Sequence, residues 1–191
     1  MSSTPTPILT SRTKKSTVRP LDPPVFLRIL GIDPGSFATG YGVVEEREGR
    51  ILQVECGSIV PGRHRAFLIR LSDIHDAVAE IVERFSPQEV AVETPFYHRN
   101  VRSMLQLGQA KAVALLPAIR AGLPIFEYAP RQIKLAVAGH GNAEKRQVSR
   151  MVSLLLGSAS PESTDASDAL AVAICHAHRS QSLRRLKKSL A

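Results

Sequence analysis

The sequence predicts one mixed α/β domain, and three features of the chain support this class. Three apolar runs separated by glycine-bearing turns occupy residues 26–33, 39–46 and 50–60, as expected for successive hairpin strands. From residue 67 onward, apolar residues recur at every third or fourth position, which is the period of an amphipathic helix. Strand-like and helix-like segments then alternate, which favours a mixed sheet flanked by helices. The length of 191 residues suits one domain of about 150 residues with tails.

The remaining elements follow from apolar periodicity and from breaking residues. The first helix presents apolar residues at positions 67, 71, 74, 78, 81 and 85, and Pro87 ends it. A short strand is predicted at 89–94 and a fifth at 124–130, on either side of a helix at 102–121 that Pro117 kinks. Further helical patterns cover residues 131–138, 143–156 and about 165–180.

Both ends of the chain are basic and poor in large apolar groups. Residues 1–25 are rich in Ser, Thr and Pro, and they cannot bury enough surface to become ordered. They share the Arg-bearing, acid-poor character of a transit peptide but lack an apolar helical face, which favours a disordered basic arm. Residues 181–191 are expected to form a basic tail, leaving 26–180 as the folded domain. No apolar run approaches the ~18 residues of a membrane span, and two cysteines are too few for a disulfide scaffold, so we expect a cytoplasmic protein.

Charge is segregated within the folded part of the chain. Residues 99–150 carry nine basic and two acidic side chains, whereas residues 29–98 carry six basic and eleven acidic ones. This separation favours a surface for a polyanion beside a cluster of carboxylates, although an ordinary solvated face would have the same composition.

Four carboxylates stand where the predicted elements begin or end. Asp33 and Glu93 each terminate an apolar strand, and parallel neighbouring strands would bring both to the carboxyl edge of the sheet. Asp165 and Asp168 lie three residues apart in the first turn of the last helix, hence on one face of it. Acids at a helix start are also common as simple caps, so this pair alone does not specify metal chemistry.

The four acids together favour a metal site. Carboxylates brought close together repel one another unless protons or cations lie between them. Oxygen-only ligands suit Mg²⁺ or Mn²⁺ rather than zinc. Two such ions about 3.5–4 Å apart can activate water and stabilise the leaving oxygen of a phosphodiester. With a basic block nearby, metal-dependent cleavage of nucleic acid is the natural inference.

Candidate nucleic-acid contacts surround these acids in the sequence. Phe96, in a predicted loop with Arg99, could stack on a base or fold back into the core. Lys134 precedes a Gly-His-Gly turn, and Lys145 and Arg146 open the next helix, where they could bind phosphate or simply face solvent. The histidines at positions 176 and 178 have H-x-H spacing, but late in a helix we expect them at its surface.

Four blocks of the sequence closely resemble the RuvC family of bacterial Holliday junction resolvases. They occur in the order and spacing of that family, between about Leu27 and His178. GIDPG alone also occurs in YqgF-type proteins and actin-like ATPases, but the four blocks together are specific. They read GIDPGSFATGYGVV, VETPFYHRN continuing into LGQAKA, FEYAPRQIKLAVAGHGNAEKRQV, and DASDALAVAICHAH.

The resemblance implies a ribonuclease-H-like fold, with a five-stranded mixed sheet flanked by helices. It implies that Phe96 wedges into the junction core and that Lys134 and Lys145 serve DNA binding and cleavage. Thr94 and Pro95 depart from the more usual polar-then-aliphatic pair, and the fixed φ of proline can re-aim the loop that carries Phe96. The family's four acidic positions fall on Asp33, Glu93, Asp165 and Asp168.

The implied activity is a structure-selective endonuclease of recombination and repair. The resemblance also implies a cytoplasmic bacterial homodimer. Each of its two sites would use two Mg²⁺ ions, with Mn²⁺ as a substitute. The two sites nick strands of like polarity at a four-way junction, with a branch-migration helicase complex of the RuvA and RuvB type as partner. Two alternatives fit less well: an actin-like ATPase needs a second duplicated domain, and a non-catalytic junction binder would lack one of the four acids.

Overall fold

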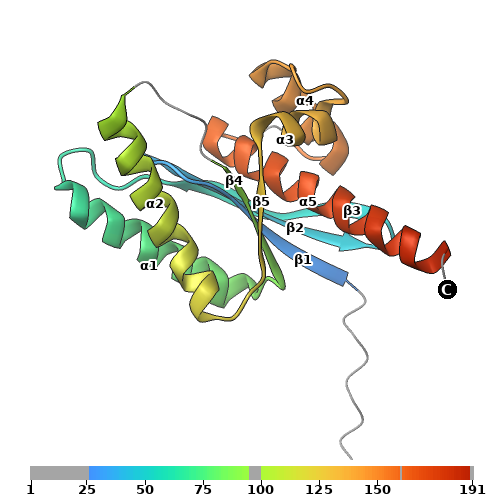
Figure 1. The fold of residues 1–191 in the computed structure, drawn as a ribbon, viewed down its shortest axis with the longest axis horizontal. Coiled ribbons are helices and arrows are strands. Elements are labelled where there is room, and N and C mark those ends of the chain that lie inside the picture. The colour runs from blue at the N-terminus through green and yellow to red at the C-terminus, as the bar shows by residue number, and fades with distance from the viewer. Residues whose placement is uncertain (1–25, 95–99, 160, 190–191) are drawn as a thin grey trace, which may run out of the picture.

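The computed structural model describes residues 26–94, 100–159 and 161–189, which form one five-stranded mixed sheet with helices on both faces (Figure 1). The strand order is β3-β2-β1-β4-β5. The first three strands make an antiparallel meander, and the last two add in parallel beside β1. The predicted fold class is therefore confirmed. The strands are β1 (Phe26–Asp33), β2 (Thr39–Arg47), β3 (Arg50–Ile59), β4 (Glu89–Glu93) and β5 (Ile125–Tyr128).

The helices divide into two groups, one on each face of the sheet (Figure 1). Helices α1 (Phe67–Phe85) and α2 (Val101–Arg120) pack together on one face. Helix α5 (Thr164–Ser189) crosses the other face, and α3 (Pro130–Ala138) and α4 (Lys145–Leu156) pack against it. Parallel strands covered on both faces bury their apolar side chains on both sides, which explains the continuous apolar run of β4.

Each face of the sheet has its own hydrophobic core. The apolar stripe of α1, including Ile74 and Val78, is buried against Ile32 and Val92 of the strands. Full burial of one such side chain stabilises the fold by about 1.5–3 kcal/mol. The predicted α1 boundary at residue 85 is confirmed, and the chain leaves the helix through a left-handed Ser86. Pro117 lies buried inside α2.

Two glycines bring α5 unusually close to the strands. A Cβ at Gly31 of β1 would clash with the backbone oxygen of Ala169, and one at Gly40 of β2 would clash with that of Asp165. The helix backbone therefore rests directly on the strands. Small residues at positions 31 and 40 thus make room for the first turns of α5 beside Asp33.

Helix α5 is longer than the sequence pattern predicted, because it continues to Ser189 instead of ending near residue 180. Residues 164–189 contain neither glycine nor proline to stop the helix. Its last turns are held against the β2–β3 turn, where Arg184 pairs with Glu46 and Gln181 Nε2 donates to the Gly49 carbonyl. None of the described helices combines the length and hydropathy needed to cross a membrane.

Candidate active site

Asp33 and Glu93 lie side by side at the carboxyl edge of the sheet. Strands β1 and β4 are parallel neighbours, and their register pairs Ile32 with Val92. Each strand ends one residue later, so both carboxylates emerge at the same edge, as the sequence predicted. Asp33 also pairs across the sheet with Gly40, the residue against which α5 packs.

Asp165 and Asp168 enter the same edge from the first turn of α5. The cap of this helix is Ser163, whose Oγ accepts from the amide of Ala166 at 3.1 Å. Ser58 Oγ lies 2.6 Å from Ser163 Oγ and 3.5 Å from Asp165 Oδ2, so β3 fixes both the cap and the carboxylate. Ser163 therefore caps the helix, and the two aspartates are not needed for that purpose.

The carboxylates are close enough to change one another's ionisation. The pKa of Asp33 is raised from 3.8 to about 7, first by burial and then by the negative charges of Asp168, Glu93 and Asp165, in that order of importance. The pKa of Glu93 is raised as well, first by burial and then by Asp168. An edge with this much repulsion attracts cations.

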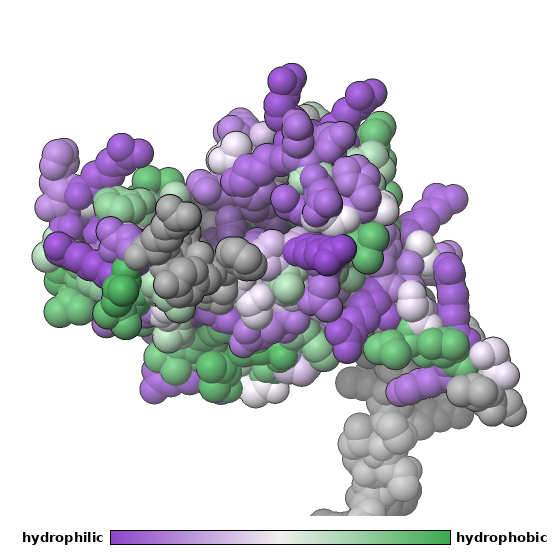
Figure 2. All heavy atoms as spheres, turned by 45° about the horizontal axis from the view of Figure 1, so that its top comes forward, coloured by the Kyte–Doolittle hydropathy of each residue, from purple (hydrophilic) through white to green (hydrophobic). Residues whose placement is uncertain are grey.

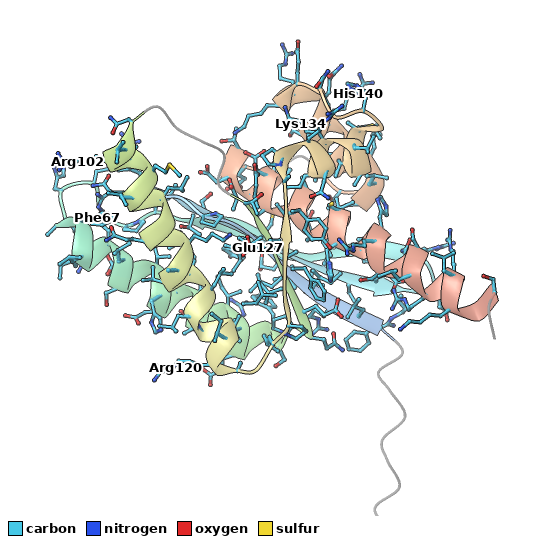
Figure 3. All side chains as sticks on the ribbon, in the orientation of Figure 1. Phe67, Arg102, Arg120, Glu127, Lys134 and His140 are labelled. Atoms are coloured by element: carbon cyan, nitrogen blue, oxygen red, sulfur yellow. The ribbon has the colours of Figure 1, made fainter. Side chains whose placement is uncertain are left out.

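Two lysines place positive charge beside these carboxylates. Lys145 Nζ forms an ion pair with Asp168 Oδ2 at 2.6 Å, and this hydrogen bond is the main reason that the pKa of Lys145 is raised. Lys134 lowers the pKa of Glu93, against the larger effect of burial. Glu93, Asp168 and both lysines line one cavity of about 260 Å³ between α3, α4 and α5. Figure 3 shows Lys134 on α3, beside the first turns of α5.

The acids are clustered but are not arranged as a finished ligand set. Among the described residues, no three His, Cys, Asp or Glu side chains are placed so that they could hold one metal ion. The position beside Asp168 is taken by the Lys145 ammonium group. The donor chemistry nevertheless fits a hard divalent cation, because all four groups are carboxylates and a positive charge would favour the ionised form of the half-buried Asp33.

The predicted DNA contacts fall into two groups. Phe96 and Arg99 lie outside the described residues. Lys134 and Lys145 are at the acids, and Arg146 follows on α4 at the wall of a neighbouring cavity. Figure 3 shows Arg102 at the start of α2 and Lys134 on α3.

A clamp that sequence patterns did not reveal holds the turn after Asp33. Arg70 of α1 is 6% exposed, and its Nη1 donates to the Ser36 carbonyl at 2.8 Å. The Arg70 guanidinium also stacks over the ring of Phe37 at 4.3 Å. In the sequence, the only sign of this contact is that Arg70 falls on the apolar side of α1. This clamp orders the loop that follows Asp33.

A second buried network corrects the expectation for His176. We expected this residue at the helix surface, but it is 2% exposed, with Nδ1 2.6 Å from the Tyr128 hydroxyl and Nε2 paired with Glu89. Its ring stacks on Phe126 at 4.3 Å. The side chain is buried because the sheet and α3 enclose this part of α5. His178 is partly exposed and contacts the Ala136 carbonyl.

Comparison with known proteins gives one consistent family. Residues 29–176 match the family model described as crossover junction endodeoxyribonuclease RuvC. A curated protein of that name from Geotalea uraniireducens (strain Rf4) is 47% identical over 154 residues, covering 81% of this chain and 90% of the relative. The solved structure of Thermus thermophilus RuvC is 35% identical with a TM-score of 0.75. The T. thermophilus RuvC in complex with a Holliday junction substrate is 34% identical to this chain, with a TM-score of 0.77. Each of these two structural matches covers 82% of this chain and 96% of the solved one.

Proposed function

This chain belongs to the RuvC family of crossover junction endodeoxyribonucleases, and on that basis we propose that it binds four-way DNA junctions and cuts them by paired, symmetric hydrolysis. The observation that carries the proposal is the cluster of Asp33, Glu93, Asp165 and Asp168 with two lysines at one sheet edge. The products would be a 5′-phosphate and a 3′-hydroxyl, which a ligase can reseal.

The four carboxylates are proposed to hold two Mg²⁺ ions per subunit, or Mn²⁺ in their place. Bound divalent cations would lower the pKa of a water molecule and offset charge on the phosphate in the transition state. Asp33 and Asp168 are the proposed shared ligands, because the charges of all three other acids raise the pKa of Asp33, and Asp168 raises the pKa of both Asp33 and Glu93. Glu93 and Asp165 complete the set, and Ser58 orients Asp165.

Lys145 and Lys134 are proposed to bind the DNA phosphates beside the acids. In the free protein Lys145 neutralises Asp168, and its side chain is exposed enough to leave that carboxylate when cations and DNA arrive. The Lys145 ammonium would then pair with a phosphate oxygen next to the cut. Lys134 of α3 lines the same cavity and would hold the DNA backbone in place.

A second copy of the chain is the proposed partner for the paired cuts. Helix α2 exposes apolar side chains along one side, among them Val101, Leu105 and Ile119, which are 57–70% exposed. In Figure 2 hydrophobic residues gather over α1 and α2, while α3 and α4 are mainly hydrophilic. Apolar stripes of this kind mark protein interfaces, and a two-fold dimer would present two identical sites to the two-fold symmetric junction.

A junction substrate also suggests where and with which proteins the chain acts. We propose a cytoplasmic location, since bacterial DNA recombination takes place there and the curated relatives are bacterial. A branch-migration helicase complex of the RuvA and RuvB type is the proposed functional partner. These two assignments rest on the family and not on contacts of the described residues.

The test compares a synthetic four-way junction with linear duplex of the same sequence, each with and without Mg²⁺. Nicks are mapped on every strand. We expect symmetric pairs of nicks on two strands of like polarity, confined to the junction and dependent on Mg²⁺. Scattered nicks in linear duplex would indicate a general nuclease, and binding without cleavage would indicate a non-catalytic junction protein.

A further inference from the structure

An exposed aromatic ring stands in the loop directly beyond Asp33. Asp33 ends β1 and pairs across the sheet with Gly40 of β2, so the residues between them form a short loop at the sheet edge that carries the four acids. Phe37 lies in this loop and is 55% exposed. Single exposed apolar residues are common on protein surfaces, so this exposure by itself indicates no function.

Contacts within the loop and from α1 hold this ring in one position. Thr39 Oγ1 donates to the Gly35 carbonyl at 2.9 Å, and Arg70 Nη1 donates to the Ser36 carbonyl at 2.8 Å. The central carbon of the Arg70 guanidinium lies 4.3 Å from the centre of the Phe37 ring and covers one face of it. The ring is therefore fixed in place, although more than half of the residue's surface is exposed.

The residue that holds the loop is itself in an unfavourable environment. Arg70 is 6% exposed, and it forms no ion pair with an acidic side chain of the described residues. Its Nε has no hydrogen-bond partner among them either. Burial of a cation without a carboxylate partner destabilises a fold, and apolar packing would hold a purely structural loop at less cost. Local arrangements that reduce stability are typical of functional sites.

Positive charge surrounds the exposed ring. Arg63 is exposed in the loop that leads into the first turn of α1, where Arg70 stands. In Figure 3, Phe67 at the start of α1 and Arg102 at the start of α2 lie at the same end of the molecule. An exposed aromatic ring among cations is the composition of protein surfaces on which nucleic-acid bases stack.

We propose that Phe37 is a stacking platform for one base of the DNA junction and that Arg70 is the residue that positions it. In linear duplex every base is stacked on both sides, so the ring finds no free base face. Where strands exchange, the stack of base pairs is interrupted and a base face becomes available. Stacking accepts any base, so this contact favours junctions over duplex without reading sequence. The inference rests on the proposed junction-cutting function and adds one determinant of its structure selectivity.

The test exploits the absence of tryptophan from the chain, because Phe37→Trp then places a single fluorescent reporter at the platform. Leu52→Trp is the matched control, since Leu52 is 48% exposed and pairs with Glu45 near the opposite end of the sheet. Each variant is titrated in EDTA with a four-way junction and with linear duplex of the same sequence. We expect the junction to quench Phe37→Trp strongly and the duplex to quench it weakly, whereas the control should respond equally weakly to both.

Two more variants measure the contribution of each residue. Phe37→Ala should weaken junction binding by about five- to a hundredfold, the range for one stacked base, and leave duplex binding unchanged. Arg70→Met, introduced together with Phe37→Trp, removes the hydrogen bond to Ser36 and the cation under the ring. It should lower both the fluorescence anisotropy of the reporter and its quenching by the junction.

Equal quenching of Phe37→Trp by junction and duplex, or no quenching by bound junction, would overturn the stacking platform. An emission that changes with protein concentration in the absence of DNA would also overturn it, because Phe37 would then contact a second subunit. Unchanged anisotropy after Arg70→Met would refute the positioning role of Arg70. All of these results leave the nuclease proposal intact, since it fails only if the parental protein does not bind and cut the intact junction.

Discussion

Replacing Asp33 with asparagine should abolish cleavage and yet make the metal-free protein more stable. The wild-type side chain places a negative charge in a partly buried position, next to three other carboxylates. Asparagine has nearly the same shape but no charge, so it removes this repulsion and keeps the packing of β1 against α5. A functional site that is strained by like charges is expected to gain stability when one charge is removed.

The size of the effect follows from the pKa of Asp33. The pKa rises from 3.8 to about 7 on folding, so the folded state binds this proton more tightly than the unfolded state does. At about 1.4 kcal/mol per pKa unit, the charged form costs at most roughly 4 kcal/mol. We expect about 2 kcal/mol, because neighbouring carboxylates share the proton in a coupled titration.

The pH dependence has a definite sign. Between pH 4 and pH 7 the folded wild type retains a proton that the unfolded chain releases, so its unfolding free energy falls as pH rises. The Asp33→Asn variant lacks this contribution. The stability difference between variant and wild type should therefore be small near pH 4, grow up to about pH 7 and then level off.

Urea unfolding in EDTA at pH 4.5, 6 and 8 measures this difference. Asp76→Asn is the matched control, because the Asp76 side chain is 72% exposed and lies on α1 away from the acids. An Asp33→Asn variant that is no more stable than wild type at pH 8, or a difference that does not change with pH, would refute the electrostatic reasoning. Mg²⁺ should stabilise wild type more than Asp33→Asn, since ligands that bind only the folded state raise its stability.

Three further predictions test other parts of the structure. Lys145→Ala should weaken junction binding and lower the slope of log affinity against log salt by about one; an unchanged slope in a salt titration argues against a phosphate contact. His176→Phe keeps the stacking on Phe126 but removes the buried hydrogen bonds that His176 makes with the Tyr128 hydroxyl and Glu89, so it should lower the unfolding free energy by about 2–4 kcal/mol. If the His176→Phe variant unfolded in urea at the wild-type concentration, the hydrogen bonds of His176 would be dispensable for stability. Leu105→Glu should turn a dimer into a monomer in sedimentation velocity, whereas a dimer that persists would place the interface elsewhere.

The sequence was sufficient for the positions of Asp33 and Glu93 because both end apolar strands. Parallel neighbours must deliver such residues to one edge, and the β1–β4 register does so. Asp165 and Asp168 were ambiguous, since a capping acid and a ligand have the same position in a sequence. The structure places the cap at Ser163 through a local hydrogen bond, whereas the close approach of Asp165 to Gly40 depends on contact between distant segments.

Features that depend on packing between distant elements could not be predicted. His176 is buried because the sheet and α3 enclose α5, whereas its sequence neighbourhood resembles a helix end. The Lys145–Asp168 ion pair joins α4 to α5 across a gap of more than twenty residues.

The central claim is that the four carboxylates at the sheet edge hold divalent cations. Anomalous diffraction from crystals soaked in Mn²⁺ tests this claim most directly, with Asp33→Asn crystals as the comparison. We predict anomalous density among Asp33, Glu93, Asp165 and Asp168, with the Lys145 ammonium displaced from Asp168, and weaker density in the variant. Saturating Mn²⁺ with no density at this edge, or density only at sites away from these four residues, would contradict it.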